Sequence, residues 1–173
     1  MNTIQFNYAE SCGVSTQQLH ECTNKLQEES ARINSAQLEQ YNTDYASINL
    51  PHDTELLTTI NAVVKEKKAL NPTLMIIIGI GGSNLGTIAI IEALHGKFYN
   101  DQSDIAVYFA DTIDTDYLNA IMKYAEKELR SGNNILLNVI SKSGTTTETI
   151  VNFKLFLELL KSIAPTTIII LLS

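Results

Sequence analysis

One stretch of the sequence gathers hydroxyl groups around a lysine and a glycine. It reads SKSGTTTET, from Ser141 to Thr149, and lies between an apolar segment and a segment with helical spacing. Hydroxyls donate hydrogen bonds, a lysine adds a positive charge, and a helix start offers free N–H groups at the positive end of its dipole. Three or four charge-assisted hydrogen bonds of roughly 1.5–3 kcal/mol each would hold a phosphomonoester. The donors of this stretch are the ammonium group of Lys142 and the hydroxyl groups of Ser141, Ser143, Thr145, Thr146 and Thr147.

A second stretch concentrates glycine. The string GIGGSNLG, from Gly79 to Gly86, contains four of the eight glycines of the chain and follows the apolar run LMIII. A strand, a glycine-rich turn and a helix start together form a typical anion-binding arrangement. In parallel α/β sheets, ligands bind beyond the carboxyl ends of the strands, at the crevice where the strand order reverses. We therefore expect Gly82 and Ser83 to face the hydroxyl-rich loop across that crevice.

Structural explanations remain open for several of these residues. Glu148 stands three residues after Thr145, which is the spacing of a helix capping box. Ser83 and Asn84 are both common helix N-caps. Lys142, taken alone, is also typical of a solvated surface lysine.

Two common nucleotide-binding motifs do not fit the spacing. A dinucleotide fingerprint needs G-x-G-x-x-G, but Gly79 and Gly81 are followed by Asn84 at the third glycine position. If this region bound a dinucleotide, Asp111 would bind the ribose. The simpler interpretation is that Asp111 begins a turn. A P-loop needs Gly-Lys-Ser/Thr at a helix start, and Gly96-Lys97 is followed by Phe98.

Composition narrows the class of protein and of partner. At 173 residues the chain can bury about 70% of its unfolded surface without disulfides or metals. Its net charge of −7 and scattered lysines argue against nucleic acid as a partner. No apolar run approaches the ~20 residues that span a bilayer, and the first residues lack the pattern of a secretion signal. We therefore expect a cytoplasmic protein without a membrane partner.

The cysteines and histidines give no sign of a metal site. Cys12 and Cys22 lie ten positions apart without a Cys-x-x-Cys pattern, so we expect reduced thiols. The three histidines, which have no partners at ligand spacing and are interpreted as structural, are His20, His52 and His95.

Two helices are predicted before the glycine-rich region. Apolar residues recur at helical spacing over residues 14–40, where Ser15 and Gln18 have the spacing of a capping box. Residues 41–52 lose that period and are expected to form a connection. A second helix is predicted from Asp53 or Thr54 to near Asn71, just before Pro72.

Beyond Pro72 the pattern alternates between strands and helices. Continuous apolar runs, typical of parallel strands buried on both faces, cover residues 74–80, 105–110, 135–140 and 167–172. Helices are predicted between them at residues 84–95, 115–131 and 146–163, with Gly96, Gly132 and Pro165 as stop signals. This alternation predicts an α/β fold with a doubly wound parallel sheet in the flavodoxin-like strand order.

The two loops together resemble the sugar isomerase (SIS) fold, and specifically the phosphoglucose isomerase family. That family carries GIGGSxLG after its first sheet strand and SKSGTTxET, or a close variant, after its third. The strings GIGGSNLG and SKSGTTTET, about 60 residues apart, match both. The resemblance is weaker over LPHDTELLTTI, which begins at Leu50.

The resemblance implies roles for the loop residues. The phosphate of a sugar phosphate would be bound by Ser83, Ser141, Lys142, Ser143 and Thr146. Gly82 would allow a close backbone approach and Thr145 would shape the turn. Glu148 matches a family glutamate with a supporting catalytic role, the orientation of a histidine.

The resemblance also implies the reaction and the partners. The family interconverts glucose 6-phosphate and fructose 6-phosphate in glycolysis and gluconeogenesis, by ring opening and proton transfer through an enediol, with no metal or organic cofactor. The parent protein is expected to be a homodimer. The alternative hypothesis, that the chain is a dinucleotide-binding domain, would instead require NAD as the ligand.

The family's base glutamate, arginine, ring-opening histidine and late lysine would all lie beyond the position matched by Ser173. We therefore expect residues 1–50 to form a helical segment and residues 51–173 a truncated α/β domain that binds sugar phosphate without turnover. A non-catalytic sugar-phosphate sensor of the same fold remains the alternative, although residues 1–50 lack the basic helix-turn-helix that such regulators usually carry.

Overall fold

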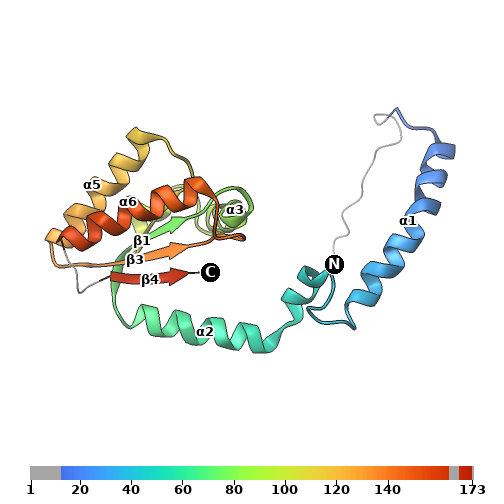
Figure 1. Ribbon diagram of the computed structural model, residues 1–173, viewed down its shortest axis with the longest axis horizontal. Coiled ribbons are helices and arrows are strands. Elements are labelled where there is room, and N and C mark those ends of the chain that lie inside the picture. The colour runs from blue at the N-terminus through green and yellow to red at the C-terminus, as the bar shows by residue number, and fades with distance from the viewer. Residues whose placement is uncertain (1–12, 164–167, 173) are drawn as a thin grey trace. The chain divides into compact units, whose positions relative to one another are not determined.

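The computed structural model describes residues 13–163 and 168–172 (Figure 1). The chain divides into two compact units, Met1–Ile60 and Asn61–Ser173, and each is described by itself. The division that we expect after residue 50 rests on sequence character alone and stays a prediction. Cys12, expected to be a reduced thiol, and Pro165, expected to stop a helix, lie outside the described residues.

The first helix, α1 (Thr16–Ala36), begins with the predicted capping box. The Ser15 side chain accepts a hydrogen bond from the Gln18 N–H, and the Gln18 side chain accepts one from the Ser15 N–H. The helix ends at Ala36, four residues earlier than the periodicity predicts. There Asn49 Nδ2 donates to the Ala36 carbonyl at 3.1 Å and to the Gln40 carbonyl at 2.6 Å. These bonds satisfy carbonyls that a longer helix would have used internally.

The connection after α1 contains a short helix that the sequence did not indicate, η1 (Ala46–His52). Helix α2 (Thr54–Lys68) follows. Asp53 caps it, because its Oδ1 accepts from the Leu56 N–H at 2.7 Å. The helix ends at Lys68, and a turn at Ala69 and Leu70 leads to Asn71, whose φ of +49° is left-handed. Helix α2 is therefore three residues shorter than predicted.

Four parallel strands form the sheet of the second unit. Within the described residues, these strands are β1 (Pro72–Ile78), β2 (Ala106–Ala110), β3 (Asn134–Val139) and β4 (Ile168–Leu172). Their order is β2-β1-β3-β4, and every neighbouring pair is parallel. The structure confirms the predicted α/β class and the flavodoxin-like order, in which the strand order reverses between β1 and β3.

Three long helices connect these strands. They are α3 (Leu85–His95), α5 (Thr115–Arg130) and α6 (Thr147–Ile163), each within one residue of the predicted bounds. Two short helices, η2 (Gly81–Ser83) and α4 (Tyr99–Gln102), were not predicted. Gly96 and Gly132 stop α3 and α5 with φ values of +76° and +82°, as their positions in the sequence predicted.

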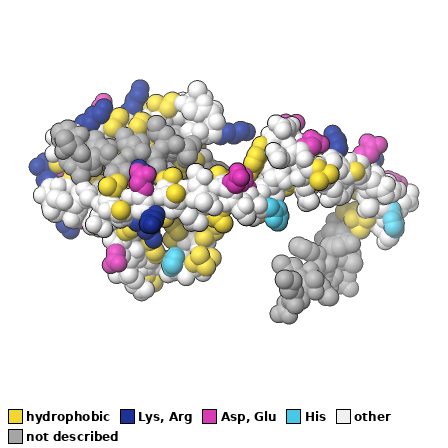
Figure 2. Space-filling model, turned by 90° about the horizontal axis from the view of Figure 1, so that it is seen from below, with side chains coloured by type: hydrophobic (Ala, Val, Ile, Leu, Met, Phe, Trp, Pro, Cys, Tyr) yellow, Lys and Arg dark blue, Asp and Glu magenta, His cyan; other side chains and the backbone are white. Residues whose placement is uncertain are grey.

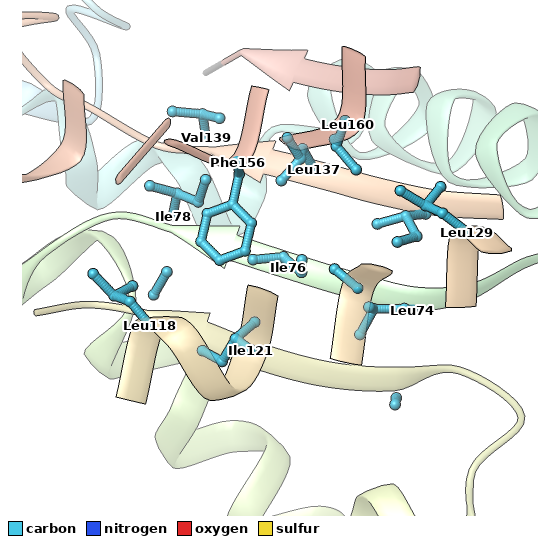
Figure 3. Close-up of a cluster of buried hydrophobic side chains, with 14 residues drawn as sticks. Leu74, Ile76, Ile78, Leu118, Ile121, Leu129, Leu137, Val139, Phe156 and Leu160 are labelled. Atoms are coloured by element: carbon cyan, nitrogen blue, oxygen red, sulfur yellow. The ribbon is translucent and has the colours of Figure 1, made fainter. Parts of the chain in front are cut away.

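The core lies between the sheet and helices α5 and α6 (Figure 3). Side chains alternate along each strand, so Leu74, Ile76 and Ile78 of β1 point to this face. The α6 residue Phe156, which is fully buried, reaches over Ile76 and Ile78. Burial of such a side chain contributes roughly 1.5–3 kcal/mol, and this packing holds the middle of α6 against the sheet.

The opposite face carries α3, whose Ile88 and Ile91 lie near Val107 and Phe109 of β2. Asn100 protects the edge strand, because its side chain exchanges two hydrogen bonds with the backbone of Val107, at 2.8 and 2.9 Å. Helix α3 nevertheless has no buried residue. It exposes Leu94 by 72%, although the sequence of the helix is almost entirely apolar.

The surface carries mixed charge. On the described part of the face in Figure 2, lysine and arginine side chains are scattered among acidic ones. Within residues 13–163 and 168–172, no helix is long and apolar enough to cross a membrane.

Candidate functional site

The carboxyl ends of β1 and β3 are held close together. The Ile140 N–H donates to the Ile78 carbonyl at 2.8 Å, just beyond the two strands. A Cβ added to Gly79 would lie 3.0 Å from the Ile140 carbonyl oxygen and 3.0 Å from Ser83 Cβ. Only glycine fits there without displacing backbone, so Gly79 lets the two loops lie against each other.

Asn84 fixes the glycine-rich loop from inside. It is buried, and its Nδ2 donates to the Gly79 carbonyl at 2.6 Å. Asn84 occupies the N-cap position of α3, but its side chain makes no capping bond. The N-cap interpretation therefore holds for its position only, and the side chain stabilises the turn between β1 and α3.

The hydroxyl-rich loop is shaped by short-range hydrogen bonds. Ser141 Oγ accepts from the Gly144 N–H at 3.0 Å. Ser143 Oγ accepts from the Thr145 N–H at 3.2 Å and from the Thr145 hydroxyl at 2.9 Å. Gly144 has a φ of +67°, a conformation that glycine adopts at little cost. Thr145 therefore contributes to the turn itself.

Helix α6 begins one residue later than the possible capping box requires. The Ile150 N–H donates to the Thr146 carbonyl at 3.0 Å, and α6 starts at Thr147. Thr146 therefore takes the N-cap position. The hydroxyl of Thr145 bonds Ser143, and no capping box between Thr145 and Glu148 forms in the described chain.

The two loops line one cavity of about 570 Å³ at the carboxyl edge of the sheet. This volume lies within the range of small-molecule sites. Its lining residues are Ile80, Gly82, Ser83, Ile140, Ser141, Lys142, Thr146 and Thr149. The structure thus brings five of the predicted site residues together, whereas Ser143, Thr145 and Glu148 do not line the cavity.

Thr149 lines the cavity but was not singled out from the sequence. It lies three residues after Thr146, a spacing that places both side chains on one face of the helix. That spacing was a signal available in the sequence. Thr149 is only 4% exposed, and its Oγ1 is buried without a hydrogen-bond partner among the described residues.

The cavity has the chemistry of an anion site rather than of a proton-transfer site. The described residues that line it contribute one cation, Lys142, together with hydroxyl groups, and include no carboxylate or imidazole. The amino end of α6 adds unpaired N–H groups and a positive dipole end. Among the residues that the structure describes, no group of three or more His, Cys, Asp or Glu side chains could hold a metal ion.

A second cavity, of about 560 Å³, belongs to residues 37–55 of the first unit. Two hydrogen bonds join its lining residues, from the Tyr41 hydroxyl to Asp53 Oδ2 at 2.6 Å and from Asn49 Nδ2 to the Gln40 carbonyl at 2.6 Å. The pKa of Asp53 is lowered by the Leu56 N–H and then by the Tyr41 hydroxyl, both of which bond the charged carboxylate. Asp53, which lines this cavity, is the cap of α2. The described lining residues include no lysine or arginine that could bind an anion.

Comparison with known proteins connects this geometry to a family. The model of the phosphoglucose isomerase family matches residues 56–168. Glucose-6-phosphate isomerase of Staphylococcus saprophyticus is 38% identical over 118 residues, which cover 66% of this chain and 25% of that protein. The Listeria monocytogenes enzyme of the same name is 40% identical over 121 residues, which cover 65% of this chain and 26% of that protein.

Glucose-6-phosphate isomerase of Streptococcus thermophilus is 41% identical over 101 residues, which cover 55% of this chain and 21% of that protein. The chain thus spans about a quarter of the length of these relatives. Because the family match extends over most of the chain and includes both loops of the cavity, the chain belongs to the phosphoglucose isomerase family.

Proposed function

We propose that this chain is the sugar-phosphate-binding part of a glucose-6-phosphate isomerase, an aldose-ketose isomerase of carbohydrate metabolism. The observation that carries the proposal is the single cavity lined by both loops, with Gly82 and Ser83 on one side and Ser141, Lys142 and Thr146 on the other. These relatives are named for glucose 6-phosphate, whose dianionic phosphate suits one lysine, several hydroxyls and a helix amino end.

The proposed division of labour follows from the residue types. Lys142 supplies the charge, while Ser83, Ser141 and Thr146 supply neutral donors. Ser143 and Thr145 set the turn that presents Ser141 and Lys142, and Glu148 keeps its supporting role from the family resemblance. Among the residues that the structure describes, the cavity lining includes no acid or base for proton transfer between C1 and C2. This chain is therefore proposed to bind substrate and to require groups from elsewhere for turnover.

Membership of an enzyme family favours this proposal over a non-catalytic sensor of the same fold. A cytoplasmic location and a homodimeric parent protein are part of the proposal. Neither loop carries the complete dinucleotide fingerprint, which supports a sugar phosphate over NAD as the ligand.

Calorimetric titration of the 173-residue chain with glucose 6-phosphate tests the proposal, with glucose as the ligand control. Lys142→Ala is expected to weaken binding about tenfold or more, because a hydrogen bond to a charged group contributes roughly 1.5–3 kcal/mol. Ser141→Ala should weaken it less. Lys154→Ala, which removes an exposed lysine of the same helix α6 outside the cavity lining, is the matched control.

A coupled assay on the same samples should show no isomerisation above background. Unchanged affinity in both the Lys142 and Ser141 variants would refute the phosphate site. Turnover by the purified chain would refute the proposed need for further groups.

A further inference from the structure

We propose that Thr149 is a further ligand-contacting residue, whose hydroxyl donates a hydrogen bond to the phosphoryl group of the bound sugar phosphate. This inference rests on the proposed function of the same cavity. It adds a donor from inside helix α6 to donors that otherwise come from the loops and the helix cap. It also assigns a function to a side chain that the structure leaves without a partner.

The first observation is the state of the hydroxyl. Three side-chain oxygens of the described chain are buried without a hydrogen bond: Asn84 Oδ1, Thr149 Oγ1 and Asn152 Oδ1. Both asparagines still anchor themselves through Nδ2, Asn84 to Gly79 and Asn152 to the Ala110 and Thr112 carbonyls. Thr149 has no second polar group. Its burial therefore carries an uncompensated desolvation cost.

The second observation is a contrast with other threonines of the same protein. A helical threonine commonly donates to the carbonyl four residues earlier. Thr23 does so to Leu19 at 2.8 Å, Thr58 to Thr54 at 2.8 Å and Thr59 to Glu55 at 3.0 Å. Thr149 does not make this local bond, so its donor is kept free in the first turn of α6.

The third observation is location. Of the three residues with a buried side-chain oxygen that lacks a partner among the described residues, Thr149 is the one that lines the cavity, beside Ser141, Lys142 and Thr146. Thr146 and Thr149 are one helical turn apart on the same face. A phosphoryl group can bind at the amino end of α6, where it contacts Lys142 and Thr146. It then has further oxygen atoms that can accept a hydrogen bond from the Thr149 hydroxyl in the first turn of the helix.

Thr149→Val tests the proposal because valine keeps the shape and removes the hydroxyl. Affinity for inorganic phosphate and for glucose 6-phosphate is expected to fall about tenfold, which is the loss of one hydrogen bond to a charged group. The melting temperature of the free chain is expected to stay equal or to rise, because the variant no longer buries an unpaired hydroxyl.

Two further variants complete the design. Thr149→Ser keeps the hydroxyl and should retain most of the affinity, with a lower melting temperature from the lost methyl group. Thr147→Val makes the same chemical change at an exposed position of α6 that does not line the cavity, and should bind as the unmodified chain does.

The outcomes separate the inference from the proposed function. If the unmodified chain binds neither phosphate nor glucose 6-phosphate, the proposed function fails. If it binds both and Lys142→Ala weakens binding while Thr149→Val does not, only the Thr149 assignment fails. If Thr149→Val loses affinity for glucose 6-phosphate but not for inorganic phosphate, the proposed contact with the phosphoryl group is wrong. If Thr149→Val has a lower melting temperature than the unmodified chain, the Thr149 hydroxyl is not unpaired in the free protein.

Discussion

The loop after β1 and the loop after β3 line one cavity, but they are built in opposite ways. The first is held by tight packing, with Gly79 against the Ile140 carbonyl and Asn84 buried beneath it. The second is largely exposed and is shaped by local hydrogen bonds that the Ser141 and Ser143 hydroxyls accept from Gly144 and Thr145. The comparison suggests that the first loop sets the shape of the cavity and that the second supplies most of its donors.

Gly79 and Gly82 of the first loop have different structural roles. The family resemblance implies that a ligand approaches the backbone closely at Gly82, whereas the tightest contact of a glycine within the described chain is at Gly79. A Cβ on Gly82 would meet no atom of the described chain within 4 Å. Because Gly82 has no side chain, it leaves space in the cavity. Because Gly79 has none, the carboxyl ends of β1 and β3 can lie close together.

The largest expected effect is on stability, at Gly79. Gly79→Ala places a methyl group 3.0 Å from a backbone carbonyl oxygen, and such overpacking costs roughly 1–3 kcal/mol. At about 2–4 °C per kcal/mol for a chain of this size, calorimetry would detect the change. Gly82→Ala is the control, since it should leave the melting temperature nearly unchanged and weaken glucose 6-phosphate binding by narrowing the cavity. Equal melting temperatures for the two variants would contradict the assigned roles.

The smallest effect is expected in the second loop, at Ser143. Its Oγ accepts from the N–H and the hydroxyl of Thr145, but the residue is exposed, so water can replace it. Ser143→Ala should change the free energy of unfolding by less than about 0.5 kcal/mol, measured by urea denaturation. It should also weaken ligand binding less than Lys142→Ala. A destabilisation as large as that of Gly79→Ala would show that the second loop is also held by packing.

The sequence predicted the elements well where local patterns determine them. The apolar runs gave all four strands, and Ser15 with Gln18 gave the start of α1, because burial on both faces and capping are recorded in adjacent residues. Gly96 and Gly132 marked helix ends for the same reason. The early end of α1 was not predictable, since it depends on Asn49, thirteen residues after Ala36.

The sequence predicted the loop residues that line the candidate cavity but not Thr149, which lines it from within helix α6. Ser83, Ser141, Lys142 and Thr146 stand next to strand ends, where the topology of a parallel sheet brings ligands. The free hydroxyl of Thr149 is visible only when its neighbours are placed in space. The exposure of helix α3 could not be predicted either, because an apolar helix is normally buried. No local sequence pattern indicates that Leu94 is exposed in the described structure.

Amide chemical-shift mapping during a glucose 6-phosphate titration tests the central claim that both loops bind one ligand. The amides of Gly82, Ser83 and residues 141–149 should shift together with a single dissociation constant, and those of residues 37–55 should not. Shifts confined to one loop, or two loops that respond at different ligand concentrations, would contradict a shared sugar-phosphate site.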